Sequence, residues 1–278
     1  MKKDDGKYLV IGIVVIVVAL IAGIVMFIKG GDKDDKAGSI DEETGKMNFV
    51  VGFDASFPPY GYLEDGEYVG FDLDLAAEVC ERLGWELKKQ PIDWASKDLE
   101  LNGDNISCIW NGFTMSDDRL DQYTWSDPYV DNSQVVIVKA DSGIEKLADL
   151  AGKKVGVQAA SSALEALNGE DQADLKESLD ELLQVADYET AFLELKAGNV
   201  DAVAMDIGVA KTKIASYGED YVILDEIIAK EQYAIGFKLG NTELRDEVQD
   251  TLDEMVKDGT FAEIAKKWGL EDSVCLGK

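Results

Sequence analysis

The chain has 278 residues, a net charge of −29 and no histidine. Its acidity argues against a nucleic-acid partner, because phosphate binding needs a basic stripe. Without imidazole, Ser-His-Asp and Cys-His catalysis and every histidine-containing zinc site are excluded. A hydrophobic content of 46% is enough for a buried core, so the body of the chain is expected to fold.

The amino terminus carries a run of 21 uncharged residues, Tyr8 to Ile28, preceded by Lys2, Lys3 and Lys7. As a helix rising about 1.5 Å per residue, this run spans roughly 30 Å, the thickness of a bilayer core. The positive-inside rule places the preceding lysines in the cytoplasm and the rest of the chain outside. We predict one N-terminal transmembrane helix, with a membrane anchor at residues 1–29. A cleaved signal peptide is the alternative, but the run is long and has no A-x-A-like cleavage site.

Residues 30–46 contain the charged stretch DKDDKAGSIDEETGK, which is poor in apolar residues and has no aromatic ones. Such a composition buries too little apolar surface to offset the entropy of folding. Residues 30–46 are therefore predicted to be a flexible linker.

Beyond the linker, short apolar runs alternate with helical patterns. Strands are predicted at Asn48–Phe53, Ile106–Trp110, Val135–Val138, Lys154–Gln158, Val200–Met205, Tyr221–Leu224 and Gln232–Phe237. Helices are predicted at Asp72–Leu83, Ile144–Leu150, Tyr188–Ala197, Ile207–Tyr217, Glu243–Lys257 and Phe261–Trp268, and one more begins at Ser162. This alternation predicts an α/β fold with largely parallel sheets.

The three cysteines are Cys80, Cys108 and Cys275, and an odd number does not make a disulfide framework. Cys80 and Cys108 lie in apolar patterns typical of small core residues, although a bridge between these two remains an alternative.

Ordered sequence blocks between Asn48 and Leu270 carry a family resemblance. They include VGFDASFPPYGY, YVGFDLDLAAEVCERLG, NISCIWNGFTMSDDR, LAGKKVGVQAASSALEAL and AGNVDAVAMD. The chain resembles the polar amino acid substrate-binding proteins of ABC importers, solute-binding protein family 3. The resemblance implies a two-lobed periplasmic-binding-protein-like fold with two hinge strands. Lobe 1 is expected at residues 47–139 plus 231–278 and lobe 2 at 140–230, with the ligand in the cleft between them.

A free amino acid carries a carboxylate and an ammonium, and each needs a partner when it is buried. Arg119 occupies the place of the family's carboxylate-binding arginine, and a guanidinium forms a bidentate fork on a carboxylate. The resemblance places Thr114, Ser161 and Ser162 beside the same carboxylate. Each of these three could instead be a helix N-cap.

For the ammonium, the resemblance points to Asp206, which follows a predicted strand; a helix cap is the alternative. Gly112 would let the ligand approach the main chain closely, within the segment formed with Asn111 and Phe113. That segment replaces a stretch that is richer in hydroxyl groups in the family. Ala160 stands where the family often has a glycine.

The side-chain pocket is expected to be formed by Asp54, Phe57 and Trp94. Aromatic walls can hold a cation or an amide plane, and Asp54 can accept a hydrogen bond from either. Such a pocket suits glutamine, lysine, arginine, histidine or cystine, and the sequence does not choose among them.

The resulting hypothesis is an extracytoplasmic component of an ABC importer, held on the cell membrane by its N-terminal helix. Its partners would be a free amino acid and the permease subunits, and no cofactor or metal is predicted. A sensing module partnered with a signalling protein is the alternative. An enzyme on the same fold would need acid–base work from residues such as Asp54 and Asp206, and no histidine or activated nucleophile supports it.

Overall fold

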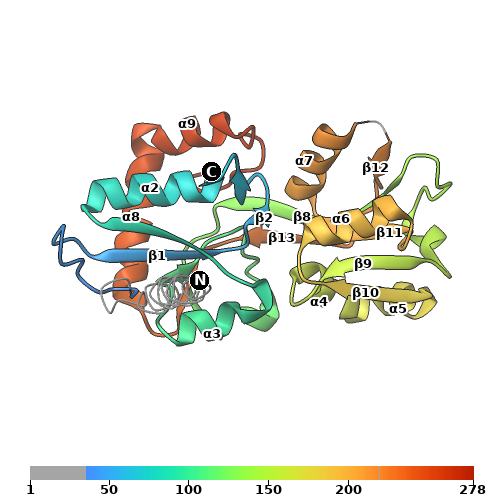
Figure 1. The fold of residues 1–278 in the computed structure, drawn as a ribbon, viewed down its shortest axis with the longest axis horizontal. Helices are drawn as coiled ribbons and strands as arrows, with labels where there is room; N and C mark the ends of the chain where they lie inside the picture. The colour runs from blue at the N-terminus through green and yellow to red at the C-terminus, as the bar shows by residue number, and fades with distance from the viewer. Residues whose placement is uncertain (1–35, 219) are drawn as a thin grey trace, which may run out of the picture.

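The computed structural model describes residues 36–218 and 220–278, in which two α/β lobes lie side by side (Figure 1). The predicted membrane anchor and the first part of the predicted linker lie outside the described residues. Among the residues that are described, we find no helix with the length and hydropathy needed to cross a membrane.

Lobe 1 is built on a five-stranded sheet. Its strands lie in the order β5 (Glu86–Pro91), β1 (Asn48–Phe53), β6 (Cys108–Ile109), β14 (Gly236–Lys238) and β7 (Tyr123–Trp125). Strand β1 runs parallel to β5 and β6, and β14 runs antiparallel to β6 and β7. The helices of this lobe are α2 (Phe71–Leu83), α3 (Lys97–Asn102), α8 (Thr242–Asp258) and α9 (Thr260–Lys267). A small sheet of β2 (Ser56–Phe57), β3 (Gly61–Glu64) and β4 (Glu67–Val69) completes this lobe.

Lobe 2 contains the second large sheet. Its strands are β10 (Glu181–Val185), β9 (Lys154–Gln158), β11 (Ala202–Asp206), β8 (Val130–Lys139) and β12 (Tyr221–Ile223), and β13 (Ala229–Tyr233) also pairs with β8. The helices are α4 (Ser162–Asn168), α5 (Ala173–Ser178), α6 (Tyr188–Ala197) and α7 (Ile207–Tyr217). The carboxyl ends of β9 and β11 and the starts of α4 and α7 face lobe 1 (Figure 1). This places the residues after these strands at the cleft.

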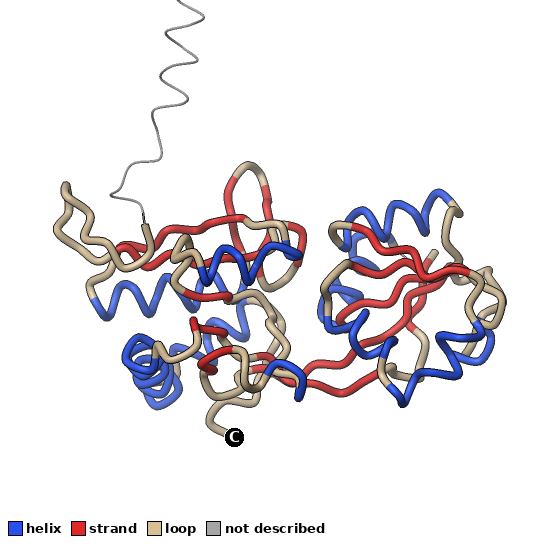
Figure 2. The backbone as a smooth tube through the Cα atoms, turned by 90° about the horizontal axis from the view of Figure 1, so that it is seen from below, coloured by secondary structure: helices blue, strands red, loops and turns tan. Residues whose placement is uncertain are grey.

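Two strands, β8 and β13, run between the lobes along one side (Figure 2). We expected residues up to 139 in lobe 1, but residues 134–138 pair with β11 in the lobe 2 sheet. The first crossing therefore comes before residue 134. The reason is that β8 is one ten-residue strand whose first half is the connection and whose second half belongs to the sheet.

The prediction of one strand at Gln232–Phe237 is wrong in the same region. The segment is divided between β13, which pairs with β8, and β14, which pairs with β6 and β7. Ala234 and Ile235 are buried between these two strands as the chain enters the lobe 1 sheet. A continuous apolar pattern cannot reveal that one run serves two sheets.

Residues 36–46, the second part of the predicted linker, lie against the start of β1. The Gly38 N–H donates to the Asn48 carbonyl at 2.9 Å, and the Asn48 N–H donates to the Ser39 carbonyl at 2.8 Å. The Asp41 carboxylate closes the turn by accepting from the Thr44 N–H at 2.8 Å. Backbone pairing holds this segment, whereas its composition reports only on the burial of apolar side chains.

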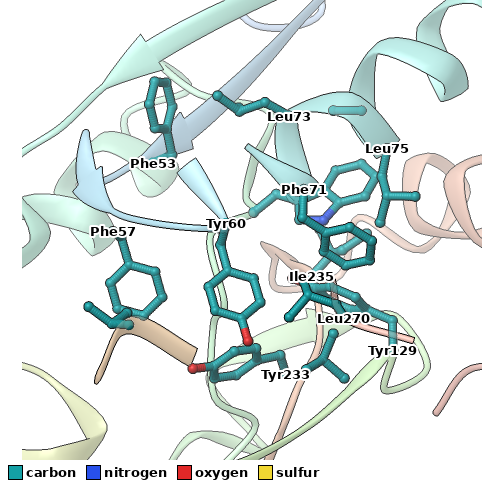
Figure 3. Close-up of a cluster of buried hydrophobic side chains, with 14 of the residues drawn as sticks. Phe53, Phe57, Tyr60, Phe71, Leu73, Leu75, Tyr129, Tyr233, Ile235 and Leu270 are labelled. Carbon is teal, nitrogen blue, oxygen red and sulfur yellow. The ribbon is translucent and has the colours of Figure 1, made fainter. Parts of the chain in front are cut away.

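An aromatic cluster joins the core of lobe 1 to the hinge strand β13 (Figure 3). Tyr60 packs edge-on against Tyr233 with ring centroids 5.1 Å apart, and Phe57 lies 5.6 Å from Tyr60. Trp110 is fully buried, and Cys80 and Cys108 are buried free thiols, as their apolar patterns predicted. These rings therefore pack closely where the hinge strand β13 meets lobe 1.

Candidate ligand-binding site

A small cavity lies where the two lobes meet. Its lining residues come from both lobes and are Phe57, Trp94, Gly112, Thr114, Arg119, Gln158, Ser161, Ser162, Tyr188 and Asp206. The cavity has a volume of about 10 Å³, which is about the space of one water molecule. The lobes must separate, or side chains must rearrange, before a larger molecule can enter.

Three residues predicted for the site do not line this cavity. Phe113 is fully buried in the core of lobe 1, where its ring lies 4.8 Å from Trp125. The Asn111 side chain instead accepts a hydrogen bond from the Asp54 N–H at 3.0 Å, so it fixes the loop that follows β1. Asp54 is separated from the cavity by Gln158, which lines it and donates to the Asp54 carboxylate.

Arg119, in the 3-10 turn Asp117–Arg119, lies in the cleft and is only 4% exposed. Its Nη2 and Nε both donate to one oxygen, Glu165 Oε1 of helix α4, at 2.5 and 3.0 Å. Its Nη1 donates to the Thr114 carbonyl at 3.2 Å, and the guanidinium lies 5.0 Å from the Phe113 ring centroid. The charge of Arg119 thus faces lobe 2, where Glu165 is its partner.

The predicted hydroxyl groups differ in what they do. Ser161 is the N-cap of α4, since its hydroxyl accepts from the Leu164 N–H at 3.2 Å. Thr114 and Ser162 form no such cap; their hydroxyls contact each other across the lobes at 3.1 Å. Both also donate to Glu231 Oε1, at 2.9 Å from Thr114 and 3.2 Å from Ser162.

Asp206 is held at the end of β11 by four donors. Its carboxylate accepts from Asn132 Nδ2 at 2.7 Å, Gln134 Nε2 at 2.6 Å, the Tyr188 hydroxyl at 2.9 Å and the Tyr233 hydroxyl at 2.6 Å. Its side chain does not cap α7, which was the alternative role. Burial raises the pKa of Asp206, and these hydrogen bonds oppose that rise.

Glu231, in β13, is an acidic residue that the sequence analysis missed. Its Oε1 accepts from Asn132 Nδ2 and Gln134 Nε2, both at 2.6 Å, so these two amides bridge Glu231 and Asp206. Burial, followed by the nearby charge of Asp206, raises the pKa of Glu231 to about 7. Asn132 and Gln134 stand in a run of four polar residues, 131–134, so no alternating pattern set them apart from their neighbours. No local signal marked Glu231 either.

Asp54 and its surroundings form the acidic side of the site. Its Oδ2 accepts from Gln158 Nε2 of lobe 2 at 2.7 Å. Burial raises the pKa of Asp54, and the charges of Asp187 and Asp93 add to the effect. Phe57 reaches across the cleft to Tyr188, with ring centroids 5.7 Å apart. The sequence analysis missed both Gln158 and Tyr188. Gln158 is an ordinary residue at the end of a strand, and Tyr188 is an ordinary residue at the start of a helix.

Gly112 and Ala160 have backbone conformations that explain their places beside the cavity. Gly112 has φ 54°, and a Cβ there would lie 2.7 Å from the Phe57 ring and 2.9 Å from the Tyr233 ring. Its N–H donates to Asp72 Oδ2 at 2.6 Å. Ala160 has φ 56°, a left-handed conformation in which glycine carries no steric penalty.

The chain is similar to several known proteins over most of its length. The model of bacterial extracellular solute-binding proteins, family 3, matches residues 49–271. The L-cystine-binding protein TcyJ of Escherichia coli strain K12 is 28% identical over 257 residues, which cover 91% of this chain and 92% of that protein. The arginine-binding extracellular protein ArtP of Bacillus subtilis is 30% identical over 228 residues, covering 81% of this chain and 88% of that protein. An ABC uptake transporter substrate-binding protein from Streptococcus pneumoniae, solved with bound histidine, has a TM-score of 0.76 and 34% identity, covering 80% of this chain and 92% of that one.

Proposed function

Because this chain belongs to the bacterial extracellular solute-binding proteins of family 3, we propose that it binds a free polar amino acid between its lobes and delivers it to the permease of an ABC importer. The family consists of binding proteins, which removes the enzyme hypothesis. The S. pneumoniae structure belongs to an uptake transporter, which supports the importer role over a sensing module.

One observation carries the proposal. Arg119 and Asp206 are opposite charges, 4% and 3% exposed, that line one cavity from opposite lobes. An amino acid zwitterion satisfies both when its carboxylate meets Arg119 and its ammonium meets Asp206. Both contacts can form together only when the lobes are closed, so such a ligand stabilises closure.

We further propose that the preferred ligand has a cationic side chain. The charges of Asp187 and Asp93 add to the burial that raises the pKa of Asp54, and a cation beside Asp54 would relieve that repulsion. Phe57 and Trp94 line the same cavity and offer aromatic faces on which a guanidinium can stack. ArtP is named for arginine, which makes arginine the first ligand to test.

Location follows from the same proposal. The uncharged run Tyr8–Ile28 is long enough to anchor the chain, and the family is extracellular. We propose that the body lies on the extracytoplasmic face of the membrane, next to its permease.

The test is isothermal titration calorimetry of residues 36–278 against arginine, lysine, histidine, glutamine and cystine, with glutamate as the unmatched control. Arginine is expected to bind most tightly, because its side chain is cationic, planar and long. If none of these ligands releases or absorbs heat, the proposal is wrong. If glutamate binds best, the assignment of a cationic ligand is wrong.

A further inference from the structure

The donors that a ligand carboxylate needs are already bonded to the protein's own glutamates. Arg119 donates to Glu165, while Thr114 and Ser162 donate to Glu231. Glu165 comes from α4 of lobe 2, and Arg119 comes from lobe 1. The Arg119–Glu165 ion pair therefore bridges the two lobes, as a bound amino acid is also expected to do.

The two glutamates are held differently. Glu231 is in hinge strand β13 and is bonded to Asn132, Gln134, Thr114 and Ser162. Glu165 has a side chain that is 37% exposed, with the Ser116 hydroxyl at 3.4 Å as its only donor in the described residues apart from Arg119. Glu165 can therefore leave, whereas Glu231 is fixed.

There is room for Glu165 to leave. It lines a groove of about 340 Å³ at the edge of the cleft, together with Thr114, Ser116, Ser162 and Glu231. A rotated Glu165 side chain would reach solvent there. The guanidinium of Arg119 would then be free to form its fork with another carboxylate.

We propose that Glu165 is a latch that competes with the ligand: it pairs with Arg119 when no amino acid is bound, and the ligand's carboxylate displaces it. This inference rests on the proposed function for the identity of the competitor, though not for the latch itself. A closed, self-paired form lowers the fraction of binding-competent molecules, and the apparent affinity falls by that fraction. Glu165 thus sets affinity without being a partner of the ligand.

The experiment compares wild type with Glu165→Gln, which keeps the side chain's shape and removes its charge. Glu181→Gln is the matched control, because Glu181 pairs with Lys154 at 2.8 Å on the surface of the same lobe, outside the lining of the cleft cavity. Calorimetry with arginine measures affinity, and small-angle scattering without ligand measures opening. Glu165→Gln is expected to bind roughly fivefold more tightly and to have a larger radius of gyration, while Glu181→Gln stays at wild-type values.

Weaker or unchanged binding by Glu165→Gln would overturn the latch, since Glu165 would then support Arg119 rather than compete for it. Tighter binding with no opening in the absence of ligand would overturn it as well. If wild type binds none of the amino acids, the proposed function fails, but scattering still decides: an unchanged radius of gyration in Glu165→Gln rejects the latch, and an increase supports it.

Discussion

The two charged ends of the cleft are built in different ways. At one end, Asp206 is surrounded by donors from lobe 2 and from the hinge strands and is 3% exposed. At the other end, Arg119 is bonded across the cleft to the partly exposed Glu165. The Asp206 end is therefore preorganised, whereas the Arg119 end must exchange one carboxylate for another.

We therefore expect the two ends to have different roles: the Asp206 end holds the ligand, and the Arg119 end controls the closure of the lobes. A rigid acid whose neighbours are already in place can receive an ammonium without reorganising its surroundings, and Oδ2 of Asp206 has one donor, the Tyr188 hydroxyl, among the described residues. A pair that crosses the cleft changes when the lobes move, so it reports and controls closure. Substitutions at the two ends should therefore differ in size and in kind.

The largest effect is expected at the preorganised end. Asp206→Asn removes the charge that pairs with the ligand's ammonium and should weaken arginine binding by on the order of 100- to 1000-fold, because an unpaired buried charge costs about 3–5 kcal/mol. Calorimetry measures this loss. Tyr188→Phe is the control, since it removes one of four donors to Asp206 and keeps the negative charge. Binding by Asp206→Asn within tenfold of wild type would show that this end does not hold the ammonium.

A smaller loss is expected at the exchanging end. Arg119→Lys keeps the charge but loses the guanidinium fork, so arginine binding should weaken by about 10- to 100-fold. Arg245→Lys is the matched control, because Arg245 bonds to the Trp125 carbonyl and to Asp246, away from the cleft. Equal affinity for Arg119→Lys and wild type would remove Arg119 from the site.

The sequence predicted this arrangement unevenly. Strands β1 and β9 and helices α6 and α7 begin and end where local patterning placed them, because their apolar residues follow one period from end to end. The hinge was misplaced because β8 is a single strand that serves both as the connection and as part of the lobe 2 sheet. The segment Gln232–Phe237 likewise joins two structures, within one largely apolar run. Nothing local to a strand shows where it leaves one sheet for another.

The family resemblance pointed to Arg119 and Asp206, and both line the cavity, while their roles in binding stay predictions. Residues whose place in the site arises only from the meeting of distant segments were missed. Glu165 and Glu231 are ordinary acids in their local sequence, and only the closing of the lobes places them beside Arg119, Thr114 and Ser162. Those partners are fixed by tertiary structure, so local patterns do not contain them.

The side-chain end gives a test of selectivity. Asp54→Asn removes the negative charge that lies behind Gln158 and should weaken arginine binding by about tenfold while changing glutamine binding little, since a neutral amide does not need the charge. The ratio of the two affinities, measured by calorimetry on one preparation, isolates this effect from any change in stability. A uniform loss for both ligands would mean that Asp54 only holds Gln158 in place.

The smallest effect concerns the acid pair Glu231 and Asp206. It is measured as the change of melting temperature with pH. The pKa of Glu231 is raised to about 7, from 4.5, by burial and by the charge of Asp206. A carboxyl whose pKa is raised by folding binds its proton more tightly in the folded state, so its contribution to stability is complete below about pH 4.5 and is lost as the pH rises through about 7. The melting temperature should therefore fall between pH 5 and pH 8.

Glu231→Gln should reduce that fall by about 3 °C, corresponding to a contribution on the order of 1 kcal/mol in a body of this size. Other buried acids titrate in the same window, because burial raises the pKa of Asp72 to about 7 as well, so the quantity that matters is the difference between the variant and wild type. Asp72→Asn is the control: it shows how much the fall of melting temperature with pH changes when a buried acid other than Glu231 or Asp206 is removed. If Glu231→Gln keeps the full wild-type slope, then Glu231 is already ionised beside Asp206, and the preorganised end must hold two negative charges rather than one and a proton.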